Sequence, residues 1–166
     1  DPIPPPQGAI VLRQHWQYAI RRDGTRRARN CCDGSPRAAP ILHRLAQTYS
    51  SCVEQPVQRK FFSLAASLGY KIYVGDAKDA YAHSPPPSLP TYVAIDDQYA
   101  DWYRWKYGKE IDRNMVLPVQ HALQGHPESG RLWEHHISKI WAKDDLQFKP
   151  CTHDKTIYRS DYAGQP

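Results

Sequence analysis

Residues 70–83 read YKIYVGDAKDAYAH, and this stretch predicts the centre of the fold. Tyr70, Ile72 and Val74 occupy alternate positions, a period of two that is typical of a β-strand. A glycine follows, so Asp76 is expected at the exposed carboxyl end of this strand. A carboxylate held on a rigid element suits Mg²⁺, whose remaining positions are filled by water and phosphate oxygens. Turn formation or helix capping is the alternative role of an aspartate in such a position.

Upstream, the sequence predicts a two-stranded ribbon that is rich in arginine. Polar and apolar residues alternate through residues 11–20, and residues 26–32 can return as a second strand. The pair Asp23–Gly24 between them is a strong hairpin signal.

Between the ribbon and residue 70, the sequence predicts one helix. Residues 51–54 read SCVE, a capping box, and Pro56 is acceptable in a first helical turn. Gly69 is expected to end the helix. The apolar residues that recur at helical spacing are Val57, Phe61, Leu64, Ala65 and Leu68.

Downstream, strands alternate with helices. Strands are expected at 91–95, 115–120 and 155–159, and helices at 97–107 and from Pro127 onward. The last helix carries an apolar stripe of Leu132, Trp133, Ile137, Ile140 and Trp141. This order predicts an α+β fold in which helices pack on an antiparallel sheet.

Length and composition indicate one domain or a piece of a larger one. The chain has 166 residues, of which 40% are hydrophobic, and a mean hydropathy of −0.73. Residues 1–8 are rich in proline and are expected to form a linker, which leaves 9–166 as the domain. No apolar run approaches the ~18 residues of a membrane span, and the first residues do not resemble a signal peptide. We therefore expect no membrane partner and no secretion.

The positive charge is confined to the first quarter of the sequence. Residues 1–44 contain eight arginines, no lysine and three aspartates, whereas the remaining residues balance fourteen basic against fourteen acidic side chains. The arginine guanidinium binds phosphate oxygens in pairs, so the pattern favours a nucleic acid or a nucleoside triphosphate as partner. A solvated charged surface is the alternative.

Cysteine and histidine do not indicate a metal site. The cysteines at 31, 32, 52 and 151 form no CxxC pair, which favours reduced thiols in an intracellular protein. The histidines lack the spacing of paired zinc ligands and are expected at the surface. Those considered are His121, His126, His135, His136 and His153.

The stretch GDAKDAYAH at 75–83 resembles the first aspartate motif of reverse transcriptases. Asp76, Lys78, Ala80 and His83 match the pattern DVKTAFLH of copia-type retrotransposon enzymes, whereas residues 79–81 match the retroviral pattern DVGDAY.

Two further stretches resemble the same family in the same order. Residues 122–133, ALQGHPESGRLW, are similar to the copia pattern ALYGLKQSPRAW, and Gln124 matches a glutamine that retroviral enzymes place against the incoming nucleotide. Residues 16–29 are similar to the pattern W-x-[FY]-x-[IV] followed by KAR, from which residues 30–33 depart. The resemblance spans about residues 11–159.

The resemblance implies the fingers and a partial palm of a copia-type reverse transcriptase, an RNA-directed DNA polymerase. By similarity, Asp76 is the catalytic carboxylate and binds one of two Mg²⁺ ions with the Ala77 carbonyl. The backbone amides of Asp79 and Ala80 face the triphosphate. The remaining nucleotide-binding residues are Tyr81, which packs under the sugar and excludes a 2′-hydroxyl, Gln124 in the pocket, and Arg27 and Arg29 on the phosphates.

The implied partners are an RNA/DNA template-primer and deoxynucleoside triphosphates. Integrase and RNase H are possible polyprotein neighbours, and the implied location is intracellular, in a cytoplasmic virus-like particle or the nucleus. The sequence is expected to stop before the hairpin that carries the catalytic x-D-D. One alternative is a non-catalytic nucleic-acid-binding remnant of a degenerate or domesticated element. Another is an unrelated magnesium-dependent phosphoryl-transfer enzyme that uses Asp76 and Asp79.

Some residues have simpler interpretations. The string Ile95–Asp97 resembles x-D-D but precedes a helix, so Asp96 is expected to be an N-cap. Tyr81 could be a core residue, and Gln124–Gly125 an ordinary turn. The aromatic stripe Tyr99, Trp102, Tyr103 and Tyr107 is expected to pack on its own helix rather than stack with bases.

Overall fold

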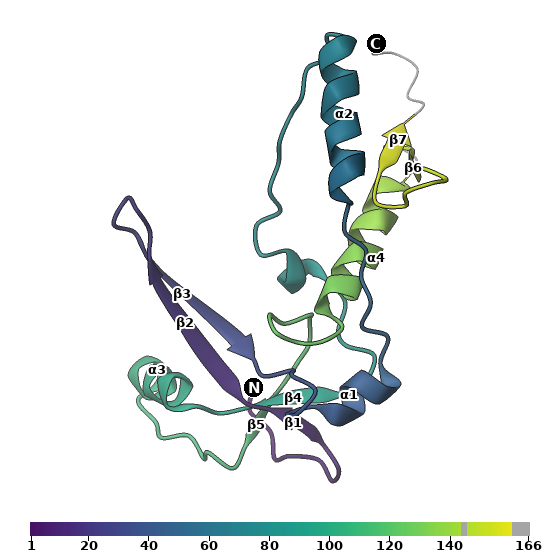
Figure 1. The fold of residues 1–166 in the computed structure, drawn as a ribbon. Helices are drawn as coiled ribbons and strands as arrows, with labels where there is room; N and C mark the ends of the chain where they lie inside the picture. Colours follow the sequence, from purple (N-terminus) through teal and green to yellow (C-terminus); the bar gives the residue numbers. More distant parts are fainter. Residues whose placement is uncertain (144–145, 161–166) are drawn as a thin grey trace.

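The computed structural model describes residues 1–143 and 146–160, and its fold belongs to the expected α+β class (Figure 1). In chain order, the elements are β1 (Ile10–Leu12), β2 (Gln14–Ile20), β3 (Arg26–Cys32), α1 (Pro40–Leu45), α2 (Gln55–Ser67), the 3₁₀ helix η1 (Ala80–His83), β4 (Thr91–Ala94), α3 (Asp97–Tyr107), β5 (Val116–Pro118), α4 (Ser129–Trp141), β6 (Phe148–Pro150) and β7 (Tyr158–Ser160).

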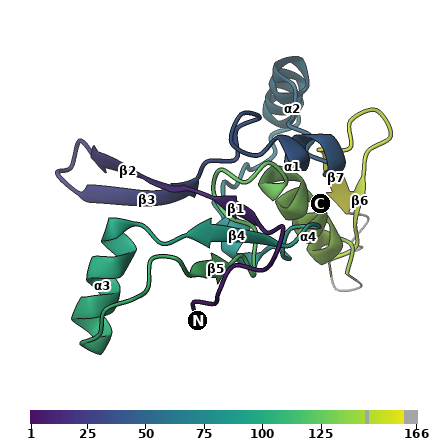
Figure 2. The same ribbon diagram turned by 90° about the horizontal axis from the view of Figure 1, so that it is seen from below.

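The predicted ribbon is confirmed. β2 and β3 pair antiparallel over seven residues each, and the ribbon projects from the body of the molecule (Figure 2). Its turn is closed by a bond of 2.9 Å from the Thr25 amide to the Asp23 carboxylate. Gly24 has φ 80°, which a residue without Cβ adopts at little steric cost.

The base of the ribbon rests on a small mixed sheet and the core. β1 pairs parallel with β4, and β4 pairs antiparallel with β5, so the purely antiparallel sheet that the sequence predicted is wrong. The proline-rich segment is tied to this sheet, because Ile3 and Val116 exchange backbone bonds of 2.9 and 2.8 Å. The buried core consists of Leu12, Cys32, Ala39, Leu42 and Val93.

The strand predicted over residues 70–74 is not formed, and Asp76 therefore does not end a central strand. The segment leaves α2 as an extended chain that pairs with no strand of the described residues. Tyr73 and Val74 are 86% and 92% exposed. Alternation predicts a strand only where a neighbouring strand supplies hydrogen bonds and a covered face, and the described residues supply neither.

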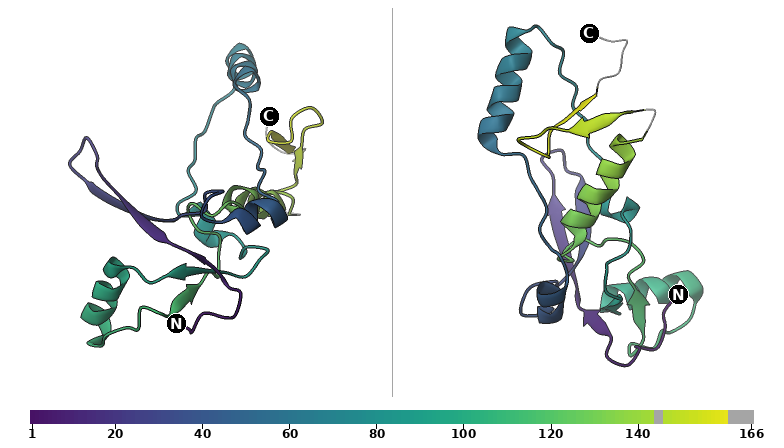
Figure 3. Two further views of the ribbon diagram at one scale, coloured as in Figure 1. Left: turned by 60° about the horizontal axis from the view of Figure 1, so that its bottom comes forward. Right: turned by 90° about the vertical axis from the view of Figure 1, so that its right-hand side faces the viewer.

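Helix α2 differs from its prediction at its start and on its apolar face. It begins at Gln55 after Glu54, with no side-chain cap, so the capping box at 51–54 is wrong, while Pro56 in the first turn is confirmed. The Ser51 amide instead donates to the Glu134 carboxylate at 2.9 Å. Ala65 is buried, but Phe61 remains 52% exposed, because α2 stands away from the body between two long segments (Figure 3).

Helix α3 follows its prediction closely. The Asp96 carboxylate accepts the Tyr99 amide at 2.8 Å, which confirms the N-cap, and Gly108 ends the helix at φ 65°. The other Asp96 oxygen accepts the Trp16 indole N–H at 2.7 Å and thus ties α3 to the ribbon. The predicted aromatic stripe packs on itself, with Tyr103 and Tyr107 centroids 4.7 Å apart.

At the carboxyl end, helix α4 carries the second hairpin. The expected last strand is shifted to Tyr158–Ser160, and its partner β6 precedes it in the chain. The hairpin packs on α4 through Trp141, whose ring lies 4.6 Å from that of Tyr158. Helix α1 and the turn η1 were not predicted. No helix in the described part of the chain is long and apolar enough to cross a membrane.

Candidate functional site

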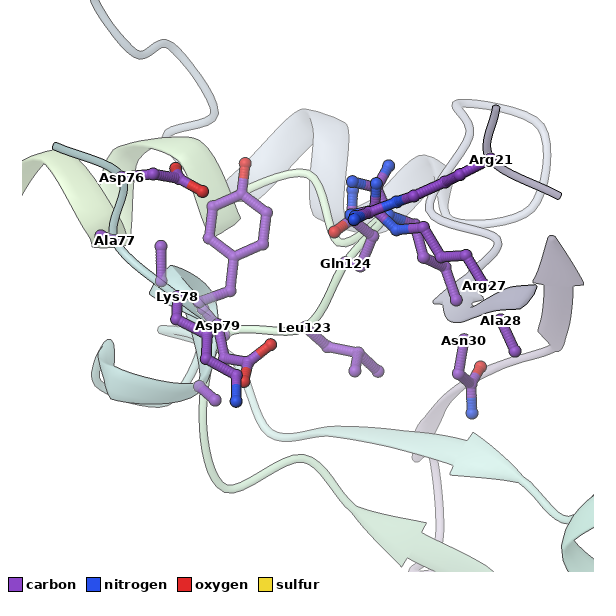
Figure 4. A pocket seen from close by; sticks show the side chains of 15 residues that line it. Arg21, Arg27, Ala28, Asn30, Asp76, Ala77, Lys78, Asp79, Leu123 and Gln124 are labelled. Atoms are coloured by element: carbon purple, nitrogen blue, oxygen red, sulfur yellow. The ribbon is translucent and has the colours of Figure 1, made fainter. Parts of the chain in front are cut away.

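A pocket of about 670 Å³ opens between the ribbon, the turn around η1 and the loop before α4 (Figure 4). It gathers three parts of the chain that are far apart in sequence. Its lining residues are Arg21, Arg27, Ala28, Arg29, Asn30, residues 76–82, Ala122, Leu123 and Gln124.

All of the site residues predicted from the sequence line this one pocket. They are Arg27, Arg29, Asp76, Ala77, Asp79, Ala80, Tyr81 and Gln124. Their positions do not depend on the missing strand, because the extended chain at 70–76 still delivers Asp76 to the pocket.

The first wall is the ribbon. Arg27 and Arg29 are two positions apart on β3, opposite Ala19 and Gln17, so they share one face. Arg21, just beyond the end of β2, was not predicted as a site residue. Figure 4 shows the guanidinium groups of Arg21 and Arg27 directed toward Gln124.

The second wall is the turn that begins at Asp76. Asp79 has φ 51° and ψ 40°, a left-handed conformation that a non-glycine residue seldom adopts. It starts η1, where the Ala82 amide donates to the Asp79 carbonyl at 2.8 Å. The backbone of residues 79–81 therefore forms part of the pocket wall. The carboxylates of Asp76 and Asp79 lie in different parts of it (Figure 4).

The third wall is the loop at Gln124, which is fastened to the base of the ribbon. The Cys32 amide donates to the Gln124 carbonyl at 2.8 Å. Gly125 has φ 87°, and a Cβ there would lie 2.1 Å from the Cys32 carbonyl oxygen. A Cβ on Gly34 would lie 2.2 Å from the Gly125 carbonyl oxygen. Both glycines are required by close backbone contact, so Gln124–Gly125 is more than an ordinary turn.

The pocket carries more positive than negative charge. It is lined by four cationic side chains, three arginines and Lys78, and by the carboxylates of Asp76 and Asp79. Within residues 1–143 and 146–160, no salt bridge involves any of these six side chains. The four cationic side chains are therefore available to an anion, and guanidinium groups suit phosphate in particular.

The donors in the pocket do not form a site for two Mg²⁺ ions. Two-metal catalysis needs several carboxylates around ions about 3.5–4 Å apart. In the described part of the chain, no three His, Cys, Asp or Glu side chains come together as ligands. Asp76 with the Ala77 carbonyl offers the beginning of such a site, and Asp79 points elsewhere. Asp96 is committed to the Tyr99 amide and the Trp16 indole.

A buried polar network lies behind the loop that carries Gln124. His126 is only 4% exposed, so its predicted surface position is wrong. Its Nδ1 accepts the Glu128 amide at 3.2 Å, and its Nε2 lies 3.5 Å from the Thr91 hydroxyl. Burial lowers the pKa of His126 below its usual value, while Glu128 opposes the shift.

Three polar residues of this region were missed by the sequence reasoning. Arg21 and Lys78 line the pocket. The sequence signal for Arg21 was its place in the arginine-rich ribbon, and the signal for Lys78 was its similarity to the copia motif. Glu128 has no such signal, because nothing in its neighbours predicts that a carboxylate is buried there.

Comparison with known family models, curated proteins and solved structures gives no match to this chain.

Proposed function

We propose that this chain forms the fingers and the first part of the palm of a copia-type reverse transcriptase, whose reaction is RNA-directed DNA polymerisation. One observation carries the proposal: three stretches that resemble this family separately also line one pocket. They lie about 45 residues apart in sequence, from Arg29 to Asp76 and from Asp79 to Gln124, and local folding alone does not bring such segments together.

In this proposal, the pocket binds a deoxynucleoside triphosphate. Arg27 and Arg29 bind the phosphate oxygens, and the backbone of Asp79 and Ala80 faces the same group. Tyr81 packs under the sugar and disfavours a 2′-hydroxyl, while Gln124 lines the base side of the pocket. The exposed arginines of the ribbon bind the template-primer through its phosphates.

Mg²⁺ belongs to the proposal only in part. Asp76 and the Ala77 carbonyl would hold one of the two ions that, in enzymes of this kind, together polarise the attacking hydroxyl and neutralise the leaving pyrophosphate. The described residues bring too few carboxylates to the pocket for a pair of ions, so we derive no metal-dependent step for this chain. We expect that residues 1–166 alone do not polymerise.

The wider setting follows from the same proposal. An intracellular element protein, in a virus-like particle or the nucleus, would carry integrase and RNase H as neighbours. The partners would be an RNA/DNA template-primer and deoxynucleoside triphosphates.

A non-catalytic nucleic-acid-binding remnant is the second candidate. The observation that favours it is the use of Asp96 as a helix cap and as acceptor for Trp16, which leaves Asp76 without catalytic carboxylate partners in the described part of the chain. Such a remnant would keep phosphate binding by the arginines and lack polymerisation in any context.

Primer extension separates the two candidates. We expect no incorporation by residues 1–166 with Mg²⁺ or Mn²⁺, incorporation when the downstream coding segment with an intact x-D-D is appended, and its loss again in Asp76→Asn. Failure of the extended protein to polymerise, with nucleic-acid binding intact, would favour the remnant. Extension by residues 1–166 that is lost in Asp96→Asn would make the Ile95–Asp97 string the catalytic dyad.

A further inference from the structure

Glu128 is a buried carboxylate that the proposed chemistry does not use. It is 3% exposed, and its two oxygens accept the Ser88 amide at 3.1 Å and the Ser88 hydroxyl at 2.7 Å. Among the residues that the structure describes, it forms no salt bridge with a basic side chain. Burial of a carboxylate without a cation is costly, and here the cost is offset by the start of α4, whose dipole favours a negative charge at its N-cap, and by the two hydrogen bonds from Ser88.

On one side, Glu128 is linked to the wall that carries Tyr81. Ser88 is separated by three prolines from Ser84, and proline fixes φ, so the connection is stiff. Ser84 is fully buried; its amide donates to the Tyr81 carbonyl at 3.0 Å and its hydroxyl to the Ala80 carbonyl at 3.3 Å. A hydrogen bond that fixes the position of Ser88 therefore also restricts the position of the η1 turn.

On the other side, Glu128 is linked to the wall that carries Gln124. The next residue, Ser129, is 2% exposed and donates its hydroxyl to the Leu123 carbonyl at 2.6 Å. The Glu128 amide donates to His126 at 3.2 Å. These two hydrogen bonds connect the loop before α4 to the backbone of Glu128 and Ser129.

We propose that Glu128 is a positioning residue that fixes the η1 turn against the Gln124 loop and so sets the width of the pocket. A carboxylate that accepts two hydrogen bonds from one serine fixes the position of the η1 turn relative to the Gln124 loop. An apolar side chain of similar size lacks this directionality. The positioning itself rests on the geometry, and only its consequence for nucleotide affinity rests on the proposed function.

The test compares Glu128→Gln with Glu134→Gln. Glu134 lies within α4, whereas Glu128 is the residue that precedes this helix. Glu134 does not line the pocket and accepts the Ser51 amide at 2.9 Å, so the control makes the same chemical change away from the site. Hydrogen exchange is measured at the Cys32 amide, which binds the Gln124 carbonyl, and at the Ser84 amide, which binds the Tyr81 carbonyl. We expect exchange about tenfold faster at both in Glu128→Gln, relative to the slowest core amides, and no change in Glu134→Gln.

Ser88 supplies a second pair of variants for the case in which Glu128→Gln does not fold. Ser88→Ala removes the 2.7 Å bond and is expected to accelerate exchange at both reporter amides, whereas Ser88→Thr keeps a hydroxyl and is expected to restore the normal rates. Uniform acceleration across the chain, or unchanged reporters in Ser88→Ala, would overturn the positioning role.

Titration with dTTP, monitored in the same samples, separates the two proposals. If the wild-type chain binds dTTP, we expect at least fivefold weaker binding in Glu128→Gln, and equal affinity in both would overturn the inference. If the wild-type chain does not bind dTTP but the reporter amides respond as expected, the positioning role stands and the nucleotide function fails.

Discussion

The Cys32 amide donates a 2.8 Å hydrogen bond to the Gln124 carbonyl, and this bond joins the arginine ribbon to the loop that faces it across the pocket. The ribbon wall and the Gln124 wall are therefore not independent surfaces. Gly125, which follows at φ 87°, has the Cys32 carbonyl oxygen in the position where a Cβ would need space.

Gly125→Ala should destabilise the protein and open the pocket. Left-handed backbone costs an alanine roughly 1–2 kcal/mol, and the 2.1 Å contact with Cys32 adds displacement of the loop. We expect a loss on the order of 3 kcal/mol in the free energy of unfolding. Gly24→Ala is the matched control, since Gly24 has φ 80° but nothing within 4 Å of a Cβ, and should show the conformational cost alone. Equal losses in the two variants, measured by denaturant unfolding, would show that the contact with Cys32 does not restrict this position.

Asp96→Ala should destabilise the protein and remove the hydrogen bond that connects α3 to the ribbon. The variant loses the cap on Tyr99 and leaves the Trp16 indole N–H without its acceptor, for a combined loss of about 2 kcal/mol. The fluorescence of the chain should also change, because Trp16 gains solvent. Asp97→Ala removes only an exposed ion pair with Arg113 and should cost less than about 1 kcal/mol. A cost for Asp96→Ala no larger than that of Asp97→Ala would argue against this connection.

His126 should make stability depend on pH on the acid side of neutrality. Its folded-state pKa lies below the usual value of 6.5, so the unfolded chain binds more protons between these two values. The contribution is complete above about pH 7 and is lost as pH falls through 6.5 toward the folded-state pKa. His126→Gln should flatten this part of the curve, and His135→Gln, on the exposed side of α4, should leave it unchanged.

Aspartates do not confuse this measurement if it is made between pH 5 and 7. Hydrogen bonds lower the pKa values of Asp23, Asp33 and Asp154 from 3.8, chiefly those with Thr25, Ser35 and Thr156 respectively. These carboxyls therefore titrate below the pH range of the measurement. A wild-type melting temperature that stays constant from pH 7 to pH 5 would contradict the burial of a neutral His126.

Nucleic-acid binding should be weak, without sequence preference and sensitive to salt. A plot of log affinity against log salt should have a slope of about −0.9 for each phosphate contacted on a duplex. Arg27→Ala with Arg29→Ala should flatten the slope, because both side chains belong to the ribbon face of the pocket. Arg59→Ala with Lys60→Ala removes the same charge from α2 and should change the slope less. An affinity that does not vary with salt would refute binding through phosphates.

Sequence patterns over a few residues predicted correctly the elements that are stabilised by interactions between residues close together in the chain. The Asp23–Gly24 turn closes the ribbon, and Asp96 caps α3, because each depends on residues within a few positions along the chain. The strand at 70–74 failed for the opposite reason, since its alternation needed a neighbouring strand that the described residues do not provide. The parallel pairing of β1 with β4 joins residues about 80 positions apart and left no local signal.

The site shows the same division. The resemblance to a family predicted eight residues that line the pocket, because recognition of a motif does not require that the expected strand before Asp76 is formed. Glu128 was missed and His126 was wrongly predicted at the surface, because burial of a charged or titratable side chain follows from tertiary packing. Glutamate in particular is usually exposed.

The most direct test of the central claim is an NMR titration of ¹⁵N-labelled residues 1–166 with dTTP, without metal. We predict saturable shifts of the amides of Arg27, Arg29, residues 76–81 and Gln124, and their loss in the Arg27→Ala/Arg29→Ala variant but not in Arg59→Ala/Lys60→Ala. No shifts at millimolar dTTP, or shifts centred on α2 or α3 with the pocket amides unmoved, would contradict the account.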